Sequence, residues 1–233
     1  MTPERRHVIE RIATTAAVLS TLAIALGIVV AWAGYAGTTG EPYSPFNHWI
    51  SELGQPGVSA RAPVFNVALV VGGTGFVVFM VGLAMASPSR LRWVIGPVGA
   101  ISGIGGAFVG IFPMNHPTEH LVAASTFFDL GWIAVGLASI TFVRLPDPRF
   151  PRWLAVIGAA NVVAFVAFLV SLRVDEYSRQ RMAATGPVAD RPDAWIAPIL
   201  EWAVLVGIMA WTLMAGLAWR RTLTARQLAK GAR

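Results

Sequence analysis

The chain lacks cysteine and is poor in charge. None of its 233 residues is a cysteine, so disulfide bonds and thiolate metal sites are excluded. Charged residues make up 13% of the chain, against about 25% in an ordinary soluble domain. P-loops, G-x-S-x-G turns, H-E-x-x-H zinc motifs and dinucleotide fingerprints are also missing. These absences argue against a soluble enzyme and against ATP-driven transport by this chain.

Hydrophobic residues make up 55% of the chain and gather in long runs with very few charges. Each run can form a helix that spans roughly 30 Å of hydrocarbon at about 1.5 Å per residue. The first run has an apolar core of about 20 residues, longer than the 7–15 of a signal peptide, so we expect it to be retained. The pattern predicts an all-α, integral membrane bundle of six transmembrane helices in a single domain over 1–233. The expected spans are 13–35, 63–86, 93–113, 119–143, 153–173 and 195–219.

Basic residues are concentrated in alternate connections between these runs, and this bias predicts orientation. The N-terminus, the turns at 87–92 and 144–152, and the C-terminal tail hold most of the Lys and Arg. We therefore expect both termini to be cytoplasmic and 36–62, 114–118 and 174–194 to face outward. The net charge of +6 then reflects topology and attraction to anionic membrane lipids. No nucleic-acid partner is expected.

The third run carries glycines spaced 3, 4, 3 and 4 residues apart, which places them on one helical face. A glycine face lets a neighbouring backbone approach closely, which favours helix packing in lipid. We expect the partner surface to be the glycines of the second run. The two sets are Gly96, Gly99, Gly103, Gly106 and Gly110, and Gly72, Gly75 and Gly82.

The stretch NHWISELGQPG, residues 47–57, predicts a short interfacial helix over about 45–53. Ser44 would cap this helix and Gly54 would end it. An apolar stripe would face the bundle or the lipid, and His48 and Glu52, four residues apart, would share a neighbouring face. The stripe consists of Phe46, Trp49, Ile50 and Leu53.

Three segments together resemble a known family: HWISELG at 48–54, PVFN at 63–66 and GIFPMNHPTEH at 110–120. They are similar to the DUF998 family of bacterial multi-pass membrane proteins, over nearly the whole chain. This resemblance implies a bacterial plasma-membrane protein of uncharacterised function. The layout is also distantly similar to the Frag1/DRAM/Sfk1 group of six-helix proteins, some of which are linked to lipid remodelling.

Three histidines, His48, His116 and His120, are expected at helix ends on the outer side. The spacings His116 to His120 and His48 to Glu52 are each four residues, so a divalent metal site is one alternative. A metal-free polar or catalytic cluster and simple capping roles are the others. No cofactor is expected.

Two acidic residues lie within the spans, where each charge costs about 2.5–3.5 kcal/mol on insertion scales. Asp129 lies near the middle of the fourth run, one turn after Ser125, and Glu201 lies near the start of the sixth. We expect both to face the bundle interior. A neutral acid bonded to Asn161 or Ser102 is the structural alternative for Asp129.

These residues lead to a hypothesis of an outward-facing polar pocket that binds or modifies an amphipathic, lipid-like or prenyl molecule. If the protein is an enzyme, the catalytic candidates are Glu52, Glu201, His120 and Asp129, with His120 as the partner of an acid. A small proton-coupled transporter that uses Asp129, and a non-catalytic membrane organiser, remain alternatives. The loop over 174–194 is nearly charge-balanced, which is typical of a solvated loop, although it could also cover the pocket. The candidate binding residues are His48, Trp49, Ser51, His116 and Arg173.

Overall fold

The computed structural model describes residues 2–178 and 191–231 of the chain. This part contains seven helices, and the six long ones match the expected spans closely. Three of them begin with a proline in the first turn, where its missing N–H is not needed. The helices are α1 Pro3–Trp32, the 3-10 helix η1 Ile50–Gly54, α2 Ala62–Ala86, α3 Arg92–Ile111, α4 Pro117–Arg144, α5 Trp153–Val174 and α7 Ile196–Gly231.

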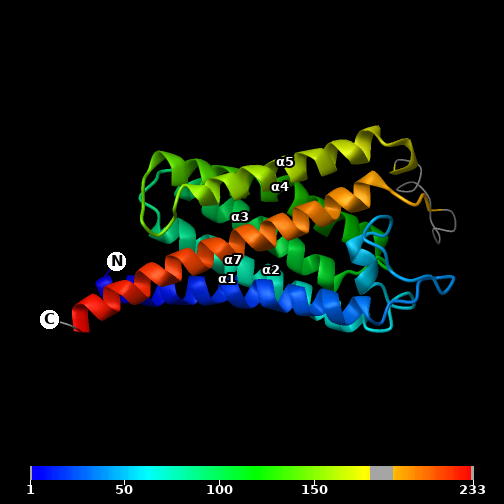
Figure 1. Ribbon diagram of the computed structural model, residues 1–233, viewed down its shortest axis with the longest axis horizontal. Helices are drawn as coiled ribbons and strands as arrows, with labels where there is room; N and C mark the ends of the chain where they lie inside the picture. The colour runs from blue at the N-terminus through cyan, green and yellow to red at the C-terminus, as the bar shows by residue number, and fades with distance from the viewer. Residues whose placement is uncertain (1, 179–190, 232–233) are drawn as a thin grey trace.

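The six long helices form a closed ring (Figure 1). Each helix packs on the next along the chain, from α1 through α5 to α7, and α7 closes the ring by packing on α1. Both termini lie at one end of the bundle, together with the turns between α2 and α3 and between α4 and α5. We call this the terminal end. The opposite end, which we call the loop end, holds 33–61 and the chain that leads into α7.

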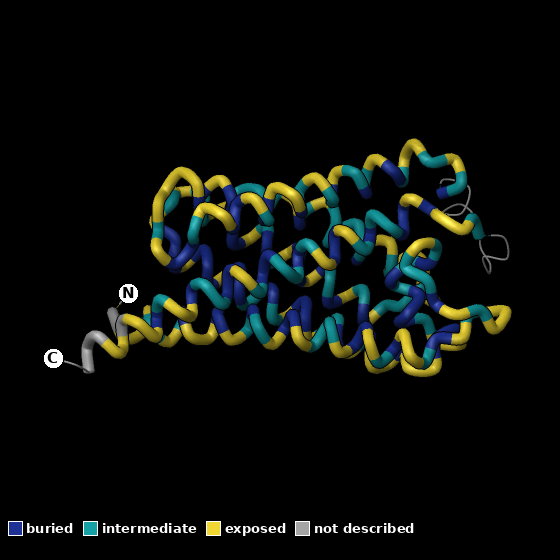
Figure 2. Tube along the Cα trace, viewed as in Figure 1, coloured by how far each residue is buried: buried dark blue, intermediate teal, exposed yellow. Residues whose placement is uncertain are grey.

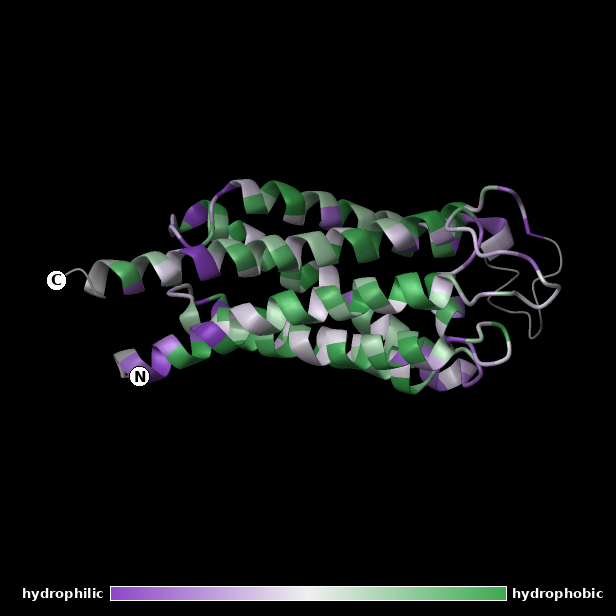
Figure 3. Cartoon of the chain, turned by 60° about the horizontal axis from the view of Figure 1, so that its bottom comes forward, coloured by the Kyte–Doolittle hydropathy of each residue, from purple (hydrophilic) through white to green (hydrophobic). Residues whose placement is uncertain are grey.

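The outer surface of the ring is apolar along its length. All six long helices are long and apolar enough to cross a membrane. Many large apolar residues on these helices are exposed. Exposed positions follow the outer side of the bundle (Figure 2), and hydrophilic residues gather mainly toward the two ends (Figure 3). Such a surface needs lipid as its solvent. The chain is therefore a multi-pass membrane protein. Outward-facing examples include Leu26, Val67, Trp93, Val156 and Val163.

The expected glycine contact between α2 and α3 is only half correct. In α3, a Cβ on Gly103 would lie 2.9 Å from the carbonyl oxygen of Gly73, and one on Gly110 would clash with the carbonyl oxygen of Asn66. The α3 glycines thus admit the α2 backbone, as predicted. The predicted partner was wrong, however, because Gly72, Gly75 and Gly82 face α1. Both faces of α2 are lined with small residues, and spacing alone does not tell them apart.

A buried ion cluster joins four segments at the terminal end. Arg149 donates to Glu10 at 2.8 Å, to Asp147 through Nε and Nη2, and to the carbonyl oxygen of Ala86 at 3.0 Å. Its guanidinium also lies against the rings of Phe150 and Trp219. The cluster ties α1, the end of α2, the α4–α5 turn and α7 together.

The predicted interfacial helix over 45–53 is not confirmed. Residues 45–48 form a single turn, in which the carbonyl of Ser44 accepts from the N–H of His48 at 3.0 Å, and η1 begins only at Ile50. The backbone between them bonds to other parts of the molecule. The N–H of Ile50 donates to Glu201, and the carbonyl of Phe46 accepts from the N–H of Trp195. These tertiary hydrogen bonds take the place of helical ones.

Candidate functional site

The loop-end segment 33–61 closes on itself before it meets the bundle. The N–H of Ala36 donates to the carbonyl of Val58, and that of Ala60 donates to the carbonyl of Gly34. These bonds hold the end of α1 beside the start of α2. The intervening residues fold back over the end of the ring. They include η1, which is largely buried.

Glu52 of η1 is buried and all its hydrogen-bonding capacity is used. Arg191 binds it with both terminal nitrogens, each at 2.8 Å. Tyr35 donates its hydroxyl at 2.9 Å, and the N–H of Trp49 donates at 2.9 Å. Arg191 also donates to the carbonyl of Asn47 at 3.0 Å. A carboxylate that accepts a bidentate guanidinium and two further donors is a fastening point, with no oxygen left over for a substrate.

Glu201 is the sixth residue of α7, and one hydrogen bond from the described residues holds its side chain. Its Oε2 accepts from the N–H of Ile50 at 2.8 Å, which fixes the start of η1 against α7. The neighbouring Trp202 donates to the hydroxyl of Tyr43 at 2.9 Å. No side chain or backbone group within 2–178 or 191–231 hydrogen-bonds the second oxygen, Oε1, although the residue is only 6% exposed. This oxygen is therefore available inside the protein.

His120 lies in the first turn of α4, and its ring is held by one hydrogen bond. Nδ1 lies 2.8 Å from the carbonyl oxygen of Phe112. Because a carbonyl can only accept, Nδ1 carries the proton, and Nε2 of the neutral ring is an acceptor. In the part of the chain that the structure describes, no group bonds to Nε2. His120 thus offers an oriented lone pair.

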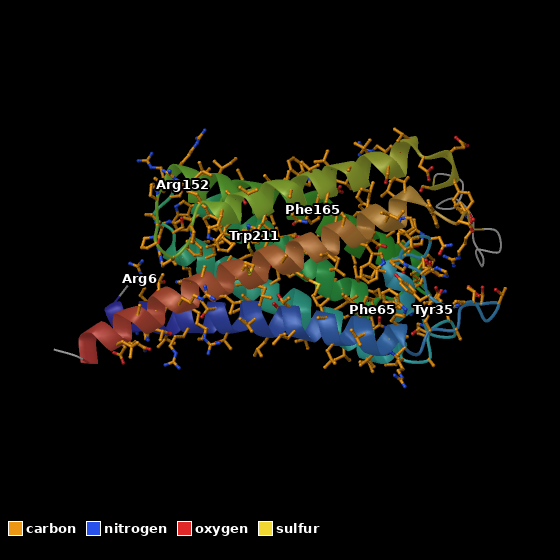
Figure 4. All side chains as sticks on the ribbon, viewed as in Figure 1. Arg6, Tyr35, Phe65, Arg152, Phe165 and Trp211 are labelled. Atoms are coloured by element: carbon orange, nitrogen blue, oxygen red, sulfur yellow. The ribbon has the colours of Figure 1, made fainter. Side chains whose placement is uncertain are left out.

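Glu201, His120 and Ser51 line the same cavity. The cavity has a volume of about 100 Å³ and lies inside the ring, between α1, α2, α3, α4 and α7. Its walls are mostly apolar. Part of the lining consists of glycines of α2 and α3, which contribute no side chain. Figure 4 labels Phe65, one of the lining side chains, toward the loop end. Other lining residues are Ile24, Gly73, Gly106, Phe127, Leu205 and Thr212.

The cavity extends a considerable way into the bundle. Glu201 and Thr212 both line it, and they are separated by about 16 Å along the α7 axis at 1.5 Å per residue. Apolar cavities of comparable size stay dry and accept apolar ligands. The cavity is therefore elongated and mostly apolar, with Glu201 and His120 toward the loop end and Ser20, Thr21 and Thr212 deeper in the bundle.

His48 is enclosed by aromatic rings beside this site. The centroids of Tyr35 and Tyr43 each lie 5.3 Å from that of His48. Burial, and then the positive charge of Arg191, lower the pKa of His48 below its ordinary value. Its Nε2 is buried, 3.9 Å from Glu41, and has no hydrogen-bond partner among the described residues. His48 is thus held neutral in a position that does not tolerate a proton well.

The two tyrosines are held as hydrogen-bond donors. Burial and the neighbouring Glu52 raise the pKa of Tyr35, while burial and Glu201 raise that of Tyr43. Tyr43 donates to the carbonyl of His48 at 3.3 Å. Both phenols therefore keep their protons and stabilise the segment that covers the cavity.

Asp129 does not face the bundle interior, so that expectation was wrong. Its side chain is exposed on the outer face of α4. The partners suggested for it bond elsewhere. Ser102 donates to the carbonyl of Phe127 at 3.1 Å, and Asn161 donates to that of Val204 at 3.0 Å.

The remaining candidates are scattered. His116 and Arg173 are exposed, while the Trp49 ring packs on that of Trp195 at 4.7 Å and Ser51 donates to the sulfur of Met114. Within the described ranges, no three His, Cys, Asp or Glu side chains are grouped closely enough to hold a metal ion. A divalent metal and the catalytic roles remain predictions.

Sequence analysis missed Tyr35, Tyr43 and the pairing of Arg191 with Glu52. Arg191 was counted among the charges of a solvated loop, of which residues 179–190 lie outside the described part of the chain. The two partners are 139 positions apart. Since nothing in the sequence signals a pairing over that separation, only the fold could reveal it.

Comparison with known proteins identifies one family. The family model described as "Protein of unknown function (DUF998)" matches residues 23–218. No curated protein and no solved structure matches the chain.

Proposed function

The chain belongs to the DUF998 family, and we propose that it binds an amphipathic, lipid-like molecule in the cavity inside its helical ring. The observation that carries this proposal is the joint position of Glu201 and His120. Both line one apolar cavity, and each keeps an atom that no described residue bonds. A ligand pocket typically combines apolar walls with a few convergent polar groups of this kind.

The two ends of the ligand would meet different surroundings. An alkyl or prenyl chain would lie along the glycine-containing walls, where apolar contact is favourable. Its polar head, such as a hydroxyl, would lie at the loop end, donate to Nε2 of His120 and accept a hydrogen bond from the Oε1 hydroxyl of a neutral Glu201. The chemistry requires a head that both donates and accepts.

Glu52 has a positioning role in this proposal. Its ion pair with Arg191 holds η1 in place, and η1 presents the N–H of Ile50 to Glu201. η1 is therefore held by a hydrogen bond to Glu201, which lines the cavity. The transporter alternative has less support, because Asp129 faces away from the ring.

We also propose that the terminal end faces the cytoplasm. The support is that the Arg-rich segments expected on the inner side all lie at that end (Figure 1). The natural absence of cysteine allows a direct test with a membrane-impermeant maleimide on intact cells. Glu119→Cys at the loop end should react, and Arg90→Cys at the terminal end should react only after lysis. The reverse pattern would invert the orientation.

The binding proposal can be tested with a long-chain alkanol that carries a photoreactive diazirine in its chain. In the purified full-length protein, labelled peptides should map to the cavity walls. Gly106→Leu should reduce this labelling about tenfold. Its Cβ has room, with the nearest atom at 3.4 Å in Phe127, so the added side chain fills the cavity without moving the backbone.

Two further variants complete this test. Ala159→Leu adds bulk on the exposed face of α5 and should leave labelling unchanged. Glu201→Gln keeps an acceptor for the Ile50 N–H but replaces the carboxyl donor with a weaker amide donor, and should weaken labelling severalfold, the effect of weakening one hydrogen bond. Labelling that is spread over the lipid-facing surface and insensitive to Gly106→Leu would refute the proposal and favour a non-catalytic organiser.

A further inference from the structure

α4 is the long helix that the rest of the chain covers least. Within its most apolar window, 28% of the residues are buried, against 39–44% for the other five spans. Its ring neighbours are α3 and α5, which leaves its outer face without a protein partner in the described structure. The middle of this face carries Asp129, twelve residues after the start of the helix and fifteen before its end.

A continuous seam runs along this outer face. Its members are separated alternately by four and three residues, the spacing of the contact positions in a left-handed helix pair. All of them are exposed or half-buried. The seam consists of Val122, Thr126, Asp129, Ile133, Gly136, Ile140 and Val143.

Asp129 is the polar residue at the centre of this seam. In the described ranges it makes no hydrogen bond or ion pair, and near mid-helix it would meet hydrocarbon if lipid covered it. The central parts of the six spans contain no Lys or Arg. A basic partner at that depth is therefore not available from this chain, in this copy or in another.

We propose that α4 of a second copy covers this seam, in a parallel dimer with its two-fold axis along the membrane normal. Two copies inserted in the same orientation place equal depths together, so each seam residue faces its own counterpart. Asp129 then lies opposite Asp129, and two carboxyl groups that share a proton hydrogen-bond each other. One polar position in an otherwise apolar seam also sets the register of the pair.

Gly136 makes a close approach feasible. A Cβ at this position would meet Val162 of α5 in ordinary contact at 3.5 Å, so Gly136 lies at the edge of the α4–α5 contact and remains half-buried. A second helix can pack against it as small residues allow in membranes. The seam thus has a polar residue, Asp129, at its centre and a glycine, Gly136, seven residues later on the same face.

Single-cysteine cross-linking tests the dimer in membranes, because the natural chain has no cysteine. Val122→Cys lies on the seam and should form disulfide-linked dimers on oxidation. Val163→Cys is a matched control that is equally exposed, on α5, and should not. Equal cross-linking at both positions, or a monomeric mass for the natural protein in lipid nanodiscs, would overturn the proposal and leave lipid as the cover of α4.

Variants of Asp129 test the polar centre. Asp129→Leu should raise the dimer dissociation constant about tenfold, as expected for the loss of one interhelical hydrogen bond. Asp129→Asn, whose amide donates and accepts, should retain the dimer. If Asp129→Leu dimerises as well as the natural protein, the carboxyl pair is wrong. A variant that does not fold leaves the cross-linking result to decide.

Discussion

The two ends of the bundle each bury an arginine, but they use it differently. At the terminal end, every guanidinium nitrogen of Arg149 has a hydrogen-bond partner, and two aromatic rings flank it. At the loop end, Arg191 binds Glu52 through two nitrogens, while its buried Nε has no partner among the described residues. The guanidinium of Arg149 therefore has no nitrogen left to bind a ligand.

Buried polar atoms without a partner among the described residues occur toward both ends, and Trp219 Nε1 and Ser139 Oγ are examples toward the terminal end. The loop end differs because two of its polar residues line the cavity inside the ring. Nε2 of His48 is buried without a partner, and Glu201 and His120 each present an uncommitted atom to the cavity. Unsatisfied polar groups are costly and tend to be kept where function needs them. The comparison teaches that the terminal end stabilises the ring and that the loop end is the place to look for ligand binding.

The largest effect is expected from Arg149→Met. The change leaves the buried carboxyl of Glu10 and the half-buried carboxyl of Asp147 without their common partner, and should lower the free energy of unfolding by about 3–5 kcal/mol. Chemical unfolding in detergent micelles measures the loss. Arg152→Met removes an exposed charge from the same turn and should stay within about 0.5 kcal/mol. If Arg149→Met lowers the free energy of unfolding no more than the control does, the proposed stabilising role of the terminal end is wrong.

Arg191→Met should have a smaller effect on stability but a larger one on binding. The expected loss in unfolding free energy is about 1–3 kcal/mol, because Glu52 keeps its bonds to Tyr35 and Trp49. Photolabelling of the cavity should fall in this variant, since η1 is no longer fastened. In Arg149→Met, labelling should persist under conditions where the protein is folded. If both variants affect labelling equally, the division of roles between the two ends is wrong.

Lowering the pH should destabilise the folded loop end, because His48 becomes protonated. Its pKa is lowered in the folded state, by burial and then by Arg191, so the unfolded chain binds the proton more readily. The stabilising contribution of neutral His48 is therefore complete above the ordinary pKa of 6.5 and is lost as the pH falls through the lowered value. Thermal unfolding at a series of pH values between 7 and 5 should show this loss.

His48→Phe provides the check on that assignment. Phenylalanine can keep the ring contacts with Tyr35 and Tyr43 but cannot bind a proton, so the acid sensitivity should decrease. His116→Gln alters an exposed histidine at the same end and should leave it unchanged. An unaltered pH profile in His48→Phe would assign the sensitivity to another group.

The smallest effect is expected from Arg173→Ala. Arg173 is exposed at the end of α5 and has no hydrogen bond or ion pair within the described ranges. Stability should change by no more than about 0.5 kcal/mol, and cavity labelling should not change. A clear loss of labelling would restore Arg173 as a binding residue, as the sequence alone had suggested.

Sequence reasoning succeeded where one-dimensional pattern is enough. The six spans and the common end of the two termini follow from the lengths of the apolar runs and from their even number. It failed for Asp129 because α4 carries polar residues on more than one side, with Ser139 and Thr141 buried and Asp129 on the outer face. A helix of this kind shows no polar stripe that distinguishes its inner face from its outer face.

The sequence by itself determined that the chain crosses a membrane six times and that its acids and imidazoles lie at particular depths, because lipid selects long apolar helices. Only the tertiary structure decided which faces turn inward and which charges meet. Arg191 joins Glu52 across 139 positions, and backbone groups of 46–50 bond to α7 and its approach in place of a helix. These contacts form only when the ring closes and brings segments distant in sequence together. There, long-range hydrogen bonds replace the local ones of a helix.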